Sequence, residues 1–152
     1  MALTYEGKVG DDLIAILTEI KTEFNRIADG TGWRDISTLL GNGWTLDANG
    51  FIRLVRRGRR ATIVFAGLNG SAATGSTIIP TASLAGFRPA VDARVTLWSS
   101  ATPYLGFVSA SSGGGGLTSA ARVAHGSQQQ EISWEVNPAQ TWPTVLPGSA
   151  VA

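Results

Sequence analysis

The sequence predicts a mainly β protein in which a short N-terminal helix, expected to form a coiled-coil stem, precedes an antiparallel β-sandwich head of jelly-roll type. Apolar residues near the N-terminus repeat with heptad spacing, which is typical of helices that pack against other helices. After residue 31, β-branched and aromatic runs alternate with turn signals about every 8–12 residues, as in sandwiches and barrels. Charge divides the chain near the same place, because residues 1–35 carry four basic and seven acidic side chains, whereas residues 36–152 carry eight basic and four acidic ones.

The helical stem is expected over residues 11–30, with Asp11 as its N-terminal cap and Gly30 as its stop. Its apolar residues are spaced alternately by four and three positions, as in the seam of a coiled coil. Ile14 and Ile16 widen the apolar face beyond a two-helix seam, which predicts a homotrimer. The same pattern also suits an amphipathic helix that packs on its own domain. A stem this short needs further contacts from the head to hold three chains together. The predicted oligomerisation residues are Leu13, Leu17, Ile20, Phe24 and Ile27.

The first ten residues form a separate segment in the sequence. They contain glycine and show no apolar period, so they have little reason to fold alone. They also lack the basic start and apolar run of a secretory signal. Leu3, Tyr5 and Val9 would suit pockets on a partner. We therefore expect residues 1–10 to anchor the chain to another protein.

The head is expected over residues 31–152 and begins with a long hairpin. A two-residue loop at Arg57-Gly58 would pair Leu54 with Ala61 and gather the apolar side chains on one face, whereas a three-residue loop would mix the two faces. The residues expected on the core face of this hairpin are Ile52, Leu54, Ala61, Ile63 and Phe65.

Two further hairpins are expected in the second half of the head. A loop over residues 99–103 would direct four apolar residues inwards and place Trp98 opposite Tyr104 on the outer face. Another hairpin would join residues 117–124 to residues 131–136. The residues expected to face inwards in these two hairpins are Val95, Leu97, Leu105, Phe107, Val123, Ile132 and Trp134.

The composition offers little material for catalysis. The chain has no cysteine and one histidine, His125, which excludes thiolate chemistry and metal sites with several histidines. No nucleophile motif surrounds His125, and Glu131 and Glu135 would lie about 13 Å apart along one strand, too far for paired carboxylate chemistry. No run reaches the roughly 18 apolar residues of a membrane span. We therefore expect no enzyme activity, no metal, no cofactor and no membrane insertion.

The densest positive charge is the run Arg-Arg-Gly-Arg-Arg at residues 56–60. A short basic run at a hairpin tip is typical of a solvated turn or a subunit contact. Such a run can also contact a polyanion. No aromatic stacking platform lies beside it in the sequence, so we expect no nucleic acid partner.

The expected outward aromatic pair is the strongest candidate for ligand binding. Two large rings on one surface suit a sugar ring or a subunit interface, although they would equally suit a second core layer. Neighbouring loops carry hydroxyl and amide groups that can bond to sugar hydroxyls. The predicted receptor contacts are Trp98, Tyr104, Gln128 and Gln129.

Several short motifs in the head resemble a known family. Gly32-Trp33-Arg34-Asp35 and Asn42-Gly43-Trp44 come before the arginine run, and Gly86-Phe87-Arg88-Pro89 and Thr141-Trp142-Pro143 come after it. This order is similar to that of head domains in minor tail and fibre proteins of actinobacterial bacteriophages. The resemblance covers about residues 32–147 and implies trimeric β heads on helical stems that recognise the host surface.

The resemblance implies a non-enzymatic virion appendage, a homotrimeric tail fibre or spike whose head adheres to the host cell, with a surface glycan as its expected ligand. Such a protein is made in the host cytoplasm and is anchored on the phage particle by other virion proteins, here through residues 1–10. Longer tail proteins of this group carry a large anchoring domain before the helix, which this sequence does not show. The same plan therefore also suits a capsid decoration or head-fibre protein that docks on the shell. A glycan hydrolase is not expected without a carboxylate pair.

Overall fold

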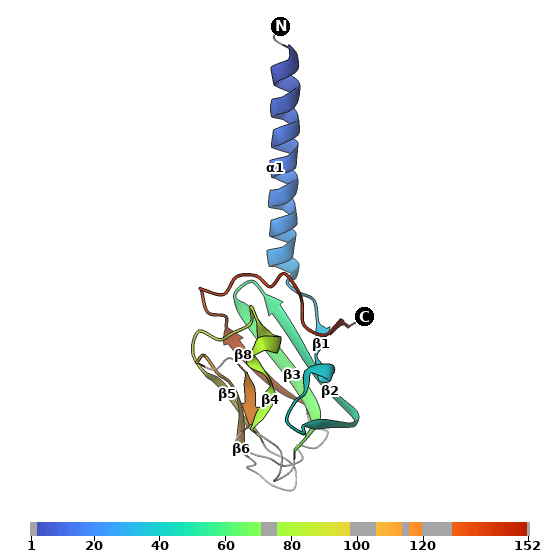
Figure 1. Ribbon diagram of the computed structural model, residues 1–152, viewed down its shortest axis with the longest axis vertical. Helices are drawn as coiled ribbons and strands as arrows, with labels where there is room; N and C mark the ends of the chain where they lie inside the picture. The colour runs from blue at the N-terminus through green and yellow to red at the C-terminus, as the bar shows by residue number, and fades with distance from the viewer. Residues whose placement is uncertain (1–2, 71–75, 98–105, 114–115, 120–128, 152) are drawn as a thin grey trace.

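The protein consists of one long helix and a β-rich head, as Figure 1 shows for the computed structural model. Helix α1, Leu3–Asp29, projects from the head along the longest axis of the molecule, with the N-terminus at its far end (Figure 1). The expected mainly β fold with antiparallel sheets after an N-terminal helix is confirmed. The structure describes residues 3–70, 76–97, 106–113, 116–119 and 129–151.

Helix α1 begins eight residues before the expected cap at Asp11. Two glycines interrupt residues 3–10, but each costs only about 1 kcal/mol in a helix and no proline is present to stop it. The expected end is confirmed, because Gly30 follows the last helical residue with a φ of +73°, the left-handed conformation of a C-terminal stop. The 27 residues of α1 span about 40 Å at the usual rise of 1.5 Å per residue.

The first sheet has five antiparallel strands in the order β8-β3-β2-β1-β9. The long hairpin of β2, Thr45–Arg57, and β3, Arg60–Asn69, forms its centre. Strand β8, Gln130–Glu135, pairs with β3 on one side. On the other side the short strand β1, Arg34–Asp35, pairs with β2 and with the C-terminal strand β9, Ser149–Ala150.

The register of the β2–β3 hairpin differs by two residues from the expected one. Leu54 lies opposite Ile63, not Ala61, and the two loop residues are Gly58-Arg59. Gly58 has a φ of +54° at the first loop position, where a type II′ turn requires glycine. Because side chains alternate with period two, an even offset leaves both faces unchanged. The predicted core face is confirmed, since each of these residues is at most 1% exposed: Ile52, Leu54, Ala61, Ile63 and Phe65.

The second sheet has four antiparallel strands in the order β4-β7-β6-β5. They are β4, Thr77–Ile79, β5, Ala93–Leu97, β6, Gly106–Ala110, and β7, Leu117–Ser119. All three pairings between neighbours are antiparallel. Segments that are far apart in the sequence therefore meet in this sheet, as β4 does with β7.

The expected register of the β5–β6 pair is wrong by one residue. Val95 lies opposite Val108, not Phe107, and Leu97 lies opposite Gly106, not Leu105. An odd offset exchanges the two faces of a strand, so the apolar set expected for this hairpin does not form as predicted. Leu105 itself lies outside the described residues.

The third expected hairpin does not form between the described residues 117–119 and 131–136. Strand β7 pairs with β4 and β6, whereas β8 pairs with β3 in the other sheet. The fit between β3 and β8 explains this choice, because the large Trp134 lies opposite the small Ala61, and Ile132 lies opposite Ile63. The inward placement of Ile132 and Trp134 is confirmed, and Val123 lies outside the described residues.

One apolar core draws side chains from both sheets. It includes Ile63 and Trp134 from the first sheet and Ile78 and Leu117 from the second. The indole Nε1 of Trp134 donates a hydrogen bond of 2.6 Å to the backbone oxygen of Phe87, which satisfies the one polar atom of the ring. None of the described side chains of α1 belongs to this core. No described helix is long and apolar enough to cross a membrane.

Candidate functional site

The first candidate surface is the apolar face of α1. Leu13, Leu17, Ile20 and Phe24 are between 54% and 69% exposed, and Ile14 and Ile16 are exposed beside them. Burying one such side chain is worth about 1.5–3 kcal/mol, so this exposed apolar row is a candidate contact surface. The alternative interpretation of the helix required α1 to pack on the head. The described side chains of α1 do not pack there.

For four residues of the predicted stem and anchor, the structure describes the backbone and not the side chain. Leu3, Tyr5 and Val9 lie in the first two turns of α1, and Ile27 lies near its end. Their side chains are outside the described part of the structure. Their roles in anchoring and oligomerisation therefore stay predictions.

Most of the predicted receptor contacts lie outside the described residues. This applies to Trp98, Tyr104 and Gln128, and also to His125. Gln129 is described and exposed, and it directly precedes β8. It lines a hollow on the outer face of the five-stranded sheet, as set out below.

The arginine run at residues 56–60 divides into two groups. Arg56 continues the alternation of Ile52 and Leu54, so it lies on the core face of β2 and is only 6% exposed. The expectation of a solvated turn is therefore wrong for Arg56. It holds for the three exposed arginines at the hairpin tip, Arg57, Arg59 and Arg60.

The guanidinium group of Arg56 joins several segments of the head. Its Nε donates to the backbone oxygen of Gly58 at 2.9 Å, and its Nη1 donates to those of Gly86 and Thr141. Its backbone oxygen also accepts a hydrogen bond of 2.8 Å from the N–H of Thr31, at the base of the stem. Arg56 is thus a structural residue.

The Gly-Phe-Arg-Pro step also has a structural explanation. Gly86 has a φ of +80°, and Phe87 is fully buried. Arg88 donates to the backbone oxygens of Ser112 and Gly113, and Pro89 forms an isolated bridge with Val136. The motif therefore helps to fix the connection between the two sheets.

Two carboxyl groups in turns have lowered pKa values. The hydroxyl and the backbone N–H of Ser37 hold the pKa of Asp35 below its usual value. The backbone N–H and hydroxyl of Ser112 do the same for Asp92, at 2.6 and 2.8 Å. Among the described residues no three histidine, aspartate or glutamate side chains come together as metal ligands would. These carboxylates therefore act as turn acceptors.

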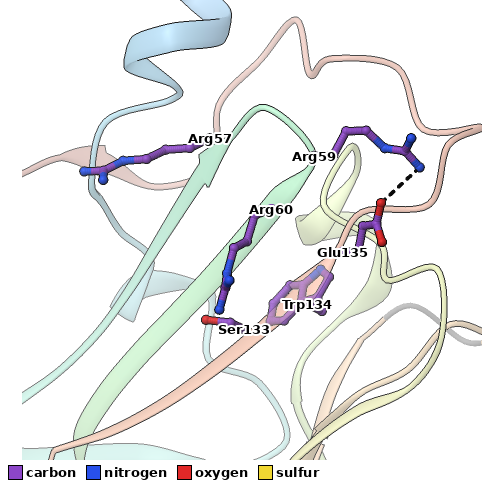
Figure 2. A pocket seen from close by; sticks show the side chains of 6 residues that line it. All are labelled: Arg57, Arg59, Arg60, Ser133, Trp134 and Glu135. Carbon is purple, nitrogen blue, oxygen red and sulfur yellow. Dashed lines mark ion pairs between the residues drawn. The ribbon is translucent and has the colours of Figure 1, made fainter.

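The second candidate surface begins at the tip of the β2–β3 hairpin. A hollow of about 530 Å³ lies there between the hairpin and β8 (Figure 2). Arg59 turns towards Glu135 and forms an ion pair of 3.2 Å, in which both side chains are more than half exposed. Such exposed pairs contribute little to stability. The hollow is lined by Arg57, Arg59, Arg60, Ser133, Trp134 and Glu135.

Two more hollows continue this surface across the same sheet. The next, about 280 Å³, shares Arg57 and Arg60 with the first and is also lined by Trp33. The third, about 310 Å³, shares Trp33 with the second. We call these three hollows together the outer-face groove. Its other residues on the second and third hollows are Phe51, Arg53, Val55, Thr62, Val64, Gln129, Glu131 and Val151.

The sequence alone does not predict the outer-face groove, because its residues come from β2, β3, β8 and both ends of the head. The alternation of the hairpin would have placed Arg53 and Thr62 on the outer face, but nothing in the sequence brings Trp33 or Ser133 beside them. Comparisons with protein-family models, with curated proteins and with solved structures find no match. The resemblance to actinobacteriophage tail proteins therefore rests on the motifs in the sequence and stays a prediction.

Proposed function

We propose that the protein is a non-enzymatic bacteriophage virion protein, a homotrimeric tail fibre or spike. Its α1 helices form a coiled-coil stem, and its β-sandwich head of jelly-roll type recognises the host surface, with a glycan as the ligand. One observation carries this proposal. Helix α1 leaves an apolar row bare, while the head has a core of its own that uses none of the described side chains of the helix.

Three copies of α1 would bury the apolar row. In a trimer, Leu17 and Phe24 occupy one core position of the heptad, and Leu13, Ile20 and Ile27 occupy the other. Ile14 and Ile16 widen the apolar face, which favours three helices over two. Each chain then removes several large side chains from water, a gain that no contact within the described part of one chain supplies.

The shape of the chain supports an appendage. The N-terminus lies at the far end of α1 from the head (Figure 1), so a partner bound to residues 1–10 would hold the head away from the particle. Leu3, Tyr5 and Val9 lie in this first part of the helix and are the proposed anchor. The proposed receptor contacts are Trp98, Tyr104, Gln128 and Gln129.

Two measurements test the proposal. Light scattering at micromolar concentration should give three times the chain mass of 15.8 kDa, and a monomer would contradict it. Gold-labelled antibody against the head should mark the tail of the phage particle. Label over the shell would instead assign the protein to capsid decoration or a head fibre, and particles without label would reject a virion role.

The anchor and the receptor contacts have tests of their own. Deleting residues 1–10 should leave a folded trimer that no longer joins the particle. Replacing both Trp98 and Tyr104 by alanine should abolish adsorption to host cells and leave the melting temperature nearly unchanged. A large fall in the melting temperature would show that the two rings belong to the core or to a subunit interface.

A further inference from the structure

We propose that the outer-face groove binds an acidic oligosaccharide, with Arg57 and Arg60 holding its acid groups and Trp33 contacting a sugar ring. The inference rests on the proposed function only for the source of the ligand, a host surface glycan. It adds a binding site on a face of the head that the predicted receptor contacts touch only at Gln129.

An unneutralised pair of positive charges marks the site. Arg57 and Arg60 lie directly opposite each other in the β2–β3 ladder, where Cβ atoms are about 5 Å apart and like charges repel. Neither side chain has an ion pair or a hydrogen bond within the described residues, whereas their neighbour Arg59 is paired with Glu135. In Figure 2 the side chain of Arg57 extends away from the hairpin and that of Arg60 runs towards Ser133, so the two charged groups point apart.

An acid group beside either arginine would neutralise its charge. Guanidinium groups bind carboxylates through two parallel hydrogen bonds, and these bonds are stronger than those between neutral groups. Four arginines line the whole groove, against the two carboxylates of Glu131 and Glu135. The groove therefore carries a positive excess that favours an anionic ligand.

The neutral lining of the groove suits sugar rings. The half-buried Trp33 lies between the second and third hollows and offers an aromatic surface. The hydroxyls of Thr62 and Ser133 lie 2.9 Å apart, and Ser133 also donates to Glu131. The amide of Gln129 lines the far end. Hydroxyl, amide and carboxylate groups in one row match the donors and acceptors of successive sugars.

The extent of the groove argues for a chain of several sugars. The three hollows share lining residues and follow one face of one sheet, so a free anion would occupy only the part beside Arg57 and Arg60. A single-stranded nucleic acid needs aromatic rings for successive bases. Three aromatic residues line the groove, but Trp134 is only 6% exposed and the guanidinium group of Arg53 covers the ring of Phe51, which leaves Trp33. An oligosaccharide with acid groups separated by neutral sugars fits both features.

The test is calorimetric titration of the full-length protein with three probes of similar length. They are a hyaluronate hexasaccharide, which alternates carboxylated and neutral sugars, the neutral maltohexaose, and a single-stranded oligothymidylate. The hyaluronate should bind at least about tenfold more tightly than either other probe, and it should weaken between about 50 and 300 mM NaCl. Equal affinity for maltohexaose, or equal affinity for the oligothymidylate, would overturn the proposal.

A double substitution tests the residues. The variant R57Q/R60Q should lose at least about tenfold in affinity for the hyaluronate, because it removes both unpaired guanidinium groups. The control K21Q/R94Q removes the same charge from the stem and from the other sheet, and it should stay within about twofold of the wild type. Unchanged binding by R57Q/R60Q overturns the assignment. A fall in its assembly mass would show that this face is a contact between copies of the chain, which also overturns it.

The outcome separates this inference from the proposed function. A trimer on the virion that ignores the acidic probe overturns the binding site and leaves the appendage intact. A monomer that binds the probe through Arg57 and Arg60 keeps the binding site and contradicts the trimeric stem.

Discussion

The guanidinium group of Arg56 lies over the indole ring of Trp142, with 4.6 Å between Cζ and the ring centroid. A planar guanidinium can stack on a ring and donate hydrogen bonds from its edge at the same time, which a lysine ammonium cannot do. Its edge here bonds to the backbone oxygens of Gly58, Gly86 and Thr141. Arg56 therefore joins the hairpin loop, the Gly86 turn and the C-terminal segment at one point.

Arg56→Lys should destabilise the head by about 3 kcal/mol, because three carbonyl bonds and the stacking contact cannot all be kept. Denaturant unfolding at a fixed protein concentration measures the free energy. The matched control is Arg57→Lys at the neighbouring exposed position, which should change stability by less than about 0.5 kcal/mol. Equal effects at the two positions would show that the contacts of Arg56 do not hold the three segments together.

Gly86→Ala should cost more stability than Gly58→Ala. Both glycines have a positive φ, which costs a residue with a Cβ about 1–2 kcal/mol. A Cβ at Gly58 meets nothing within 4 Å, whereas one at Gly86 would lie 2.9 Å from Cδ of Pro143. The difference between the two variants in thermal unfolding isolates the steric overlap, at about 1–3 kcal/mol. Equal losses would mean that Pro143 moves aside freely.

The hairpin shows what alternation can and cannot predict. The pattern of β2 and β3 fixes which residues face the core, but Leu54 can lie opposite Ala61 or Ile63 without altering either face. The same alternation, carried one step past Leu54, would have placed Arg56 on the core face. The sequence instead suggests one charged tip, because residues 56–60 form a short basic run at a predicted turn. A buried arginine is rare unless its donors are satisfied, and the partners of Arg56 are up to 85 residues away in the sequence.

The sequence alone does not predict which distant strands pair with each other. Residues 117–119 and 130–135 are close in the chain, which suggests a hairpin, yet each finds its partner in a different sheet. The fit of Trp134 against Ala61 appears only when β3 and β8 are placed side by side. The exposed apolar row of α1 is easier to predict, because Leu13 to Phe24 lie within one helix, and its role in a stem stays a prediction. The residues that line the outer-face groove come together only when the strands of the first sheet are side by side.

The carboxyl group of Asp35 should make the free energy of unfolding of the head fall at acid pH. The hydroxyl and backbone N–H of Ser37 lower its pKa in the folded state below the ordinary value of 3.8. The unfolded chain therefore binds the proton first, so the contribution of Asp35 is complete above that ordinary value and is lost as the pH falls through the folded pKa.

Asp35→Asn keeps an oxygen that can accept from Ser37 and removes the charge. Its unfolding free energy should therefore fall less steeply than that of the wild type as the pH drops below about 4. Urea unfolding across this range measures both slopes. Asp12→Asn, on the stem, controls for the loss of one carboxylate. Parallel curves for Asp35→Asn and the wild type would contradict the role of Ser37.

Ile20→Asp should break the proposed trimer. Ile20 lies in the middle of the apolar row and is 58% exposed in the single chain, so it would be buried only by other copies. Three aspartates at one level of the stem would bring like charges together in an apolar core, at a cost of several kcal/mol, roughly the whole stability of so short a coiled coil. Light scattering should show dissociation at micromolar concentration.

Thr22→Asp is the matched control, because Thr22 is also exposed on α1 but lies outside the heptad seam. It introduces the same charge only two positions away and should leave the assembly mass unchanged. Circular dichroism separates loss of assembly from loss of the head, since the β signal should survive in Ile20→Asp while the helical signal falls. If Ile20→Asp keeps the mass of the wild type, the apolar face of α1 is not the surface that holds the chains together.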